Sequence, residues 1–338
     1  MSAVTERRSW WLRVVLAVAM LATGAWVVDH GVAGIAFGAV AQVVGDVGAG
    51  HLALLALIWA GGLVMYCVVL SSAMPGLGAL HTLTVNLTGS AVANTVPLGG
   101  AVATALNWRM LKGWGHSNAA FVAFSTVTNA LAVLMKLVLP VVAVGCLVAA
   151  SVQVPVVLWC TAVVCVGLLG AAAATAVWLS YRPPSAPPAR HRWLRRVEAF
   201  LAGSGTQILA IVRRRWAWLL AGSLAYTGAQ VILLGVSLRA VGLVVPVSTI
   251  VAAAAIERLG TVVPLTPGGA GVAEAGTVAW LIATGLDPTQ AVAGVLLYRA
   301  FVVVMEIPVG GAVLAGWVWQ NRGRPTNELR RPACASLT

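Results

Sequence analysis

The chain has 338 residues, of which 60% are hydrophobic and only 9% are charged, and its formal net charge is +12 at pH 7. Continuous apolar runs recur along it, which a soluble core cannot absorb, so the composition predicts an all-α, polytopic bundle of transmembrane helices in a lipid bilayer. The basic residues gather in short segments between these runs, without the aromatic and basic surface of a nucleic-acid-binding module, so we expect no nucleic-acid partner.

About six full spans are predicted in chain order. They cover approximately residues 10–28, 51–72, 118–150, 154–180, 216–241 and 288–319. Arginines precede the first span and follow the last one. Because cytoplasmic segments of membrane proteins are enriched in Lys and Arg, we expect both termini in the cytoplasm and the protein in the cytoplasmic membrane.

The spans divide into two halves, 1–181 and 216–320, followed by a cytoplasmic tail at 321–338. The segment 182–215 between the halves contains eight arginines and one glutamate. This charge pattern predicts a basic cytoplasmic linker. An interfacial helix attracted to anionic lipid headgroups is a second interpretation of the same segment.

Two further segments, 79–113 and 246–286, hold enough apolar residues to cross the membrane but are interrupted at their centres. The interruptions read "VPLGG" at 96–100 and "LTPGG" at 265–269, and each is followed by a half-helix rich in Ala and Val. The shared pattern indicates an internal repeat, with chance similarity in an apolar chain as the alternative.

The charges at the ends of these half-helices indicate how the two segments lie. The first half-helix ends with Arg109 and Lys112, which favours the cytoplasmic side, whereas the second ends beside Asp287 with no base nearby. We therefore expect two re-entrant helical hairpins that enter from opposite faces. Such an inverted-topology repeat is common in secondary transporters.

The interruptions predict a binding site for an anion. Pro267 lacks a backbone N–H, and Gly268 and Gly269 allow close approach of the backbone, as Gly99 and Gly100 do in the first segment. A half-helix that starts after such a turn points unpaired N–H groups and a partial positive charge into the bilayer. If the two tips converge, an anion is the natural ligand.

Several charged and polar side chains lie near the second interruption. Arg258, Glu274 and Arg299 flank it and are predicted to contribute to the site, whereas Glu257 and Glu306 are expected to form structural ion pairs. The alternative is a purely structural network in which Arg258 pairs with Glu274 and Arg299 pairs with Glu306 or Glu257.

Two further polar side chains are harder to place from sequence. Asn94 precedes the first interruption and needs several hydrogen-bond partners there, so it joins the predicted site. Lys136 lies in an apolar run, where snorkelling or pairing is the default interpretation and a position facing the cavity is the alternative.

The segment 260–311 resembles the lysylphosphatidylglycerol synthase transmembrane family, also called flippase-like integral membrane proteins. The matching residues are Pro267, Gly268, Gly269, Gly271, Glu274, Ala275, Gly285 and Arg299. The first half resembles the family through Gly99, Gly100, Arg109 and Gly115. It departs from the family pattern at Asn107 and Trp108, where an acid is usual, and at "STVTN" (125–129), where an acidic-basic pair is expected.

The resemblance implies that the chain moves a phospholipid or a lipid-linked glycan across the cytoplasmic membrane. It adds Gly271 to the binding residues named above. The soluble aminoacyl-transferase domain of some relatives is not expected after residue 320, so neither is the synthase reaction.

Two other functions remain open from sequence. One is an intramembrane enzyme acting on lipids, although the chain has no GxSxG or HExxH motif and its five cysteines lack metal-ligand spacing. The other is a non-transporting accessory subunit of a lipid-synthesising enzyme. We expect no cofactor and no metal, a lipid with an anionic headgroup as ligand, and either a lipid-biosynthetic enzyme or a second copy of the chain as a further partner.

Overall fold

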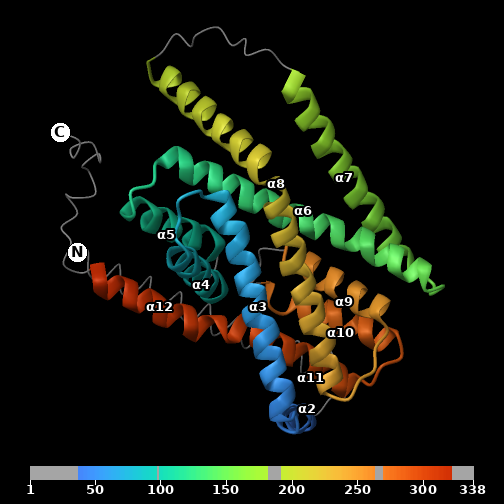
Figure 1. The fold of residues 1–338 in the computed structure, drawn as a ribbon. Helices are drawn as coiled ribbons and strands as arrows, with labels where there is room; N and C mark the ends of the chain where they lie inside the picture. The colour runs from blue at the N-terminus through green and yellow to red at the C-terminus, as the bar shows by residue number, and fades with distance from the viewer. Residues whose placement is uncertain (1–36, 97–98, 182–191, 263–268, 322–338) are drawn as a thin grey trace, which may run out of the picture.

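The structure is a computed structural model that describes residues 37–96, 99–181, 192–262 and 269–321. These ranges form helices, with no strand among them (Figure 1). The helices are α2 (Phe37–Gly45), α3 (Ala49–Ala73), α4 (Ala79–Thr95), α5 (Gly99–Gly113), α6 (Asn118–Ala149), α7 (Val156–Tyr181), α8 (Arg192–Ala240), α9 (Val247–Gly260), α10 (Val272–Ala283), α11 (Pro288–Arg299), the π-helix η2 (Ala300–Val304) and α12 (Glu306–Asn321). The predicted all-α class is confirmed.

Five helical segments of the described ranges are long and apolar enough to cross a membrane. They are Ala49–Ala73, Asn118–Ala149, Val156–Thr175, Gly203–Ala240 and Pro288–Asn321, and each overlaps a predicted span. The predicted span at 10–28 lies outside the described residues. Large apolar side chains such as Leu57 and Val157 are exposed on these helices, as expected of surfaces that face lipid. The chain is therefore a multi-pass membrane protein.

Helix α8 begins well inside the segment that the charge pattern assigned to a linker. It starts at Arg192 and runs without interruption to Ala240. The last proline before it is Pro188 and the next is Pro246, so nothing between them removes a backbone donor from the helix. The part of this segment from 192 to 215 is thus continuous with the membrane span that follows.

Helices α3 and α8 pack along each other at the centre of the molecule. Gly222 of α8 permits this contact, because a Cβ atom there would lie 2.9 Å from Val69 Cγ2 and 3.3 Å from the Met65 carbonyl oxygen of α3. Small residues of this kind let membrane helices approach closely. The α4–α5 hairpin and the α9–α10 hairpin lie on opposite sides of this pair (Figure 1).

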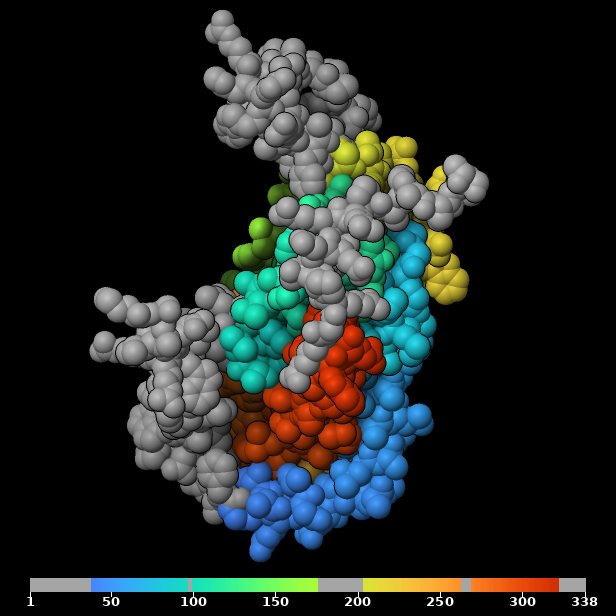
Figure 2. Space-filling view, turned by 90° about the vertical axis from the view of Figure 1, so that its left-hand side faces the viewer, coloured from blue at the N-terminus to red at the C-terminus, as the bar shows by residue number. Residues whose placement is uncertain are grey.

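Each hairpin packs against a long helix of the other half of the chain. Helix α4 packs against α12, and helix α9 packs against α6. Figure 2 shows α12 in red directly beside the blue-green α4–α5 hairpin. The two halves of the sequence are therefore interlocked rather than side by side.

Glycines lie where the two helices of each hairpin meet. A Cβ at Gly99 would lie 2.4 Å from the Ala93 carbonyl oxygen, so α5 starts in contact with the end of α4. Gly260 approaches Ala273 in the second hairpin, where a Cβ would lie 2.6 Å from Cα. Gly269 has a φ of +71°, a conformation that favours glycine. Pro267 and Gly268 lie outside the described residues.

The two hairpins also end in the same way. Gly115 follows α5 with a φ of +89°, and Gly285 follows α10 with a φ of +88°. Two residues later, the side chain of Ser117 caps α6 and that of Asp287 caps α11. Both turns thus join a left-handed glycine to an N-cap that starts a long helix.

The last span contains a π-helix between α11 and α12. The Met305 N–H donates to the Ala300 carbonyl at 2.8 Å, and Pro308 cannot donate to Val304, which favours an irregular turn here. One extra residue in a turn rotates the following residues by about 100°. Regular α-helical periodicity predicts that Arg299 and Glu306, seven residues apart, share one helical face, and the π-helix between them removes this alignment.

Candidate functional site

Four charged side chains from α9, α10 and α11 form a chain of ion pairs. Arg299 Nη1 lies 3.2 Å from Glu257 Oε1, and Arg299 Nε lies 2.6 Å from Glu274 Oε1. Arg258 Nε lies 3.2 Å from the second oxygen of Glu257. Glu257 is 2% exposed and Arg299 is 6% exposed, so the pairing compensates charges that are costly at this depth. We refer to Arg258, Glu257, Arg299 and Glu274 as the ionic cluster.

The observed pairs differ in part from the predicted ones. The pairing of Arg299 with Glu257 is confirmed, but Arg299 does not contact Glu306, and Arg258 pairs with Glu257 rather than with Glu274. The physical reason is the hairpin, which turns Glu274 of α10 toward α11. Arg299 Nη2 is buried without a hydrogen-bond partner in the described ranges, and the short Nε contact is not aligned as a hydrogen bond.

Glu274 also caps its own helix. Its Oε2 accepts a hydrogen bond of 2.6 Å from the N–H of Gly271, which precedes α10 with a φ of +92°. A carboxylate in this position compensates the partial positive charge of the helix N-terminus. The place that the sequence predicted for an anionic ligand thus holds a carboxylate of the chain itself.

Arg258 is held by neutral groups as well as by Glu257. Its Nη2 donates to Gln230 Oε1 of α8 and, at 3.4 Å, to the hydroxyl of Tyr298 in α11. The Tyr298 hydroxyl donates in turn to Gln230 Oε1 at 2.9 Å. These bonds connect three helices and fix the guanidinium at the edge of a cavity.

The cavity beside Arg258 has a volume of about 220 Å³ and is lined by two cations, Arg258 and Lys136. Its other polar lining residues are Tyr66, Asn86, Ser90, Thr128, Ser223, Tyr226 and Thr227. No carboxylate lines it among the described residues, and none there lies within ion-pair distance of Lys136. The ionic cluster is neutral as a whole. The charge of Lys136 is therefore not compensated, and the space carries an excess positive charge. We call it the cation cavity.

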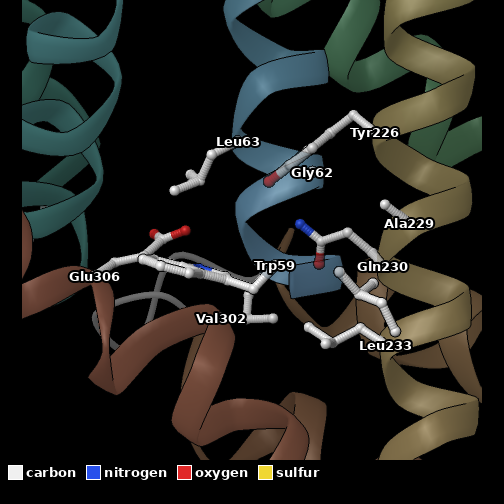
Figure 3. Close-up of a pocket in the computed structure, with 10 residues that line it drawn as sticks. Trp59, Gly62, Leu63, Tyr226, Ala229, Gln230, Leu233, Val302 and Glu306 are labelled. Carbon is white, nitrogen blue, oxygen red and sulfur yellow. The ribbon is translucent and has the colours of Figure 1, made fainter. Parts of the chain in front are cut away.

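Glu306 lies apart from the ionic cluster, in a small pocket between α3, α8 and η2. Figure 3 shows its carboxyl beside Trp59, with Gln230 and Tyr226 across the space. The pocket has a volume of about 10 Å³, at the lower limit for one water molecule. Glu306 is 7% exposed, and its Oε2 accepts a hydrogen bond of 3.5 Å from Asn94 Nδ2. Asn94 therefore ties the first hairpin to α12.

The structure brings three of the predicted site residues together and gives the others different places. Arg258, Glu274 and Arg299 meet in the ionic cluster, and only Arg258 of these lines the cation cavity. Gly99, Gly269 and Gly271 shape the hairpins, while Gly100 is exposed with open space around it.

Lys136 is the main residue that sequence reasoning did not select. A lone lysine at the centre of a span costs roughly 2.5–3.5 kcal/mol on insertion scales, which is a signal of function. Sequence alone does not distinguish a snorkelling lysine from one that faces a cavity, because the position of α9 relative to α6 decides between them. The polar residues Gln230 and Tyr298 were missed for the same reason.

The family model described as "Lysylphosphatidylglycerol synthase TM region" matches residues 10–310. The matched range includes both hairpins, the ionic cluster and every residue that lines the cation cavity. A comparison with curated proteins found no match for the chain.

Proposed function

The chain belongs to the lysylphosphatidylglycerol synthase transmembrane family, and we propose that it moves a lipid with an anionic headgroup, a phospholipid or a lipid-linked glycan, across the cytoplasmic membrane. The observation that carries this proposal is the cation cavity. Lys136 and Arg258 line it, and no carboxylate does among the described residues. A cavity of this charge inside a membrane protein favours a phosphate group over a neutral or cationic one.

The chemistry of the lining suits a phosphodiester. A guanidinium and an ammonium both donate charge-assisted hydrogen bonds to phosphate oxygens, and the hydroxyls of Ser223 and Thr227 add neutral donors. Glu257 orients Arg258, while Glu274 and Arg299 hold the second hairpin against α11. In this proposal Glu274 and Arg299 position the site, and Lys136 and Arg258 bind the phosphate.

We also infer that the two hairpins are re-entrant and form an inverted-topology repeat. Two observations support this. The turns after α5 and α10 carry the same left-handed glycine and N-cap, and each hairpin packs against a long helix of the other half. In transporters, such repeats place the substrate at their interface near the middle of the membrane.

The topology can be tested with single cysteines in a variant without native cysteines. We expect a cysteine at His116 to react with an impermeant maleimide only from the cytoplasmic side, and one at Thr284 only from the outside. The reason is that the two turns end hairpins that enter from opposite faces. Labelling of both positions from the same side would rule out the inverted arrangement.

The transport function can be tested with Lys136→Met in proteoliposomes that contain fluorescent phosphatidylglycerol. We expect translocation to slow by about tenfold or more, because a hydrogen bond to a charged group contributes about 1.5–3 kcal/mol. Lys136→Arg should retain most of the rate. Lys112→Met is the matched control, since Lys112 Nζ donates to Asn118 Oδ1 outside the cation cavity, and it should leave the rate unchanged.

Two outcomes of that experiment would contradict the proposal. Equal rates for the wild type and Lys136→Met would remove the cation cavity from the transport process. No translocation by the wild-type protein, together with co-purification of a lipid-synthesising enzyme, would favour an accessory subunit instead.

A further inference from the structure

A second polar cavity adjoins the cation cavity on the side of the first hairpin. It has a volume of about 250 Å³, far above the about 10–15 Å³ that one water molecule needs. Both cavities are lined by Tyr66, Asn86, Ser90 and Thr128, so they are neighbours that share a wall. Rotation of the side chains in this shared wall would join the two spaces, as the inference below requires. We call the second space the amide cavity.

The amide cavity is polar but uncharged. Its polar lining residues other than the four shared ones are Thr104, Asn107, Ser125 and Asn129, and no Asp, Glu, Lys or Arg lines it among the described residues. Amides and hydroxyls both donate and accept hydrogen bonds, and this is the property that recognises hydroxyl groups. A cavity with this lining does not neutralise a charged ligand.

Asn107 gives the amide cavity an unused acceptor. Its Oδ1 is buried and has no hydrogen-bond partner within the described ranges. Its side chain lies against Gly89 of α4, where a Cβ atom would come within 3.2 Å of Nδ2. An unsatisfied buried carbonyl of this kind is destabilising unless a ligand or water donates to it. A hydroxyl from a ligand would satisfy it once the Asn107 amide turns its buried oxygen toward the cavity.

The carboxylates that could bind an amine are occupied elsewhere. Glu257 and Glu274 pair with Arg299, and Glu306 accepts from Asn94 in a separate pocket. An ammonium group in the amide cavity would be desolvated without a carboxylate to compensate its charge. An unpaired charge in a competing ligand is as effective for selectivity as attraction of the right one.

On the basis of the proposed function, we infer that this site takes a phosphodiester lipid whose headgroup is an uncharged polyol or sugar, with the phosphate in the cation cavity and the hydroxyls in the amide cavity. It selects against headgroups that carry an amine, including an aminoacyl group. The phosphate is assigned to the cation cavity, and the hydroxyls to the amide cavity, because only the cation cavity compensates the phosphate charge.

The inference can be tested by competition binding to the purified full chain in detergent. The probe is fluorescent phosphatidylglycerol, and the competitors, with identical acyl chains, are phosphatidylethanol, phosphatidylglycerol, phosphatidylinositol, phosphatidylethanolamine and lysylphosphatidylglycerol. We expect the two polyol lipids to bind about tenfold more tightly than phosphatidylethanol, which carries the same charge without hydroxyls. Both amine lipids should bind more weakly still.

The nearly isosteric variant Asn107→Asp supplies the missing carboxylate. We expect it to bind lysylphosphatidylglycerol about tenfold more tightly than the wild type does and the polyol lipids more weakly. Asn118→Asp is the matched control, because Asn118 lies on the first turn of α6 outside both cavities, where its Oδ1 accepts from Trp108 and Lys112. It should leave the preference unchanged.

The outcomes separate this inference from the proposed function. Equal binding of phosphatidylethanol and phosphatidylglycerol, or wild-type binding of lysylphosphatidylglycerol as tight as that of phosphatidylglycerol, would overturn the inference and leave an anionic-lipid site in place. An unchanged preference in Asn107→Asp would also overturn it. Binding of none of the anionic lipids above the level of phosphatidylcholine would contradict the proposed function itself.

Discussion

Replacement of Arg299 by leucine should lower the free energy of unfolding by about 3–5 kcal/mol, the usual cost of removing one partner from a buried ion pair. Arg299 is 6% exposed and lies within ion-pair distance of both Glu257 and Glu274. Without it, Glu274 loses its cation and Glu257 keeps only Arg258. The change can be measured by titration with a denaturing detergent in mixed micelles.

A second substitution distinguishes the effect of losing the Arg299 charge from the effect of packing a leucine in its place. Glu274→Gln removes the unpaired charge and retains an oxygen that can accept from the Gly271 N–H. The double variant Arg299→Leu with Glu274→Gln should therefore recover a large part of the lost stability, which a double-mutant cycle would show as a coupling of more than about 1 kcal/mol. Additive effects in that cycle would mean that Arg299 acts through packing rather than through charge.

The membrane spans and the hairpin turns could be predicted because they depend on local composition. The continuous apolar runs predicted the five spans found in the described ranges, and the glycines at 99 and 269 marked the hairpin turns. The charge pattern of 182–215 does not predict that α8 starts at Arg192, although no proline lies between Pro188 and Pro246. Charge predicts the side of the membrane, and it does not predict whether the backbone is helical.

The site was harder to predict than the fold because it depends on which helices meet. Arg258, Glu274 and Arg299 stood out from sequence because buried charges are costly, and the structure places them in one cluster. Their exact partners, and the position of Lys136 opposite Arg258, depend on the packing of α6 against α9. No periodicity within one helix contains that information.

The contact between α12 and α4 predicts the other large effect on stability. Two neighbouring glycines of α12 are expected to respond in opposite ways to replacement by alanine. A Cβ at Gly310 would lie 2.1 Å from the Leu87 carbonyl oxygen and 2.7 Å from Ala91 Cβ, whereas Gly311 has open space around it. Gly310→Ala should destabilise the protein by about 3 kcal/mol, at the upper end of the range for overpacking, because a helix backbone cannot move aside as a side chain can. Gly311→Ala should be neutral or stabilise by up to about 1 kcal/mol through helix propensity.

The same pair of variants tests whether this helix contact matters for function. Gly310 lies one helical turn after Glu306, whose carboxyl accepts from Asn94 at the end of α4. If α12 is pushed away from α4, this hydrogen bond breaks and the first hairpin loses its link to the span that carries Arg299. We therefore expect Gly310→Ala to lose phosphatidylglycerol translocation even where the protein still folds, and Gly311→Ala to retain it. Similar stability and translocation in the two variants would show that α4 and α12 are not in close backbone contact.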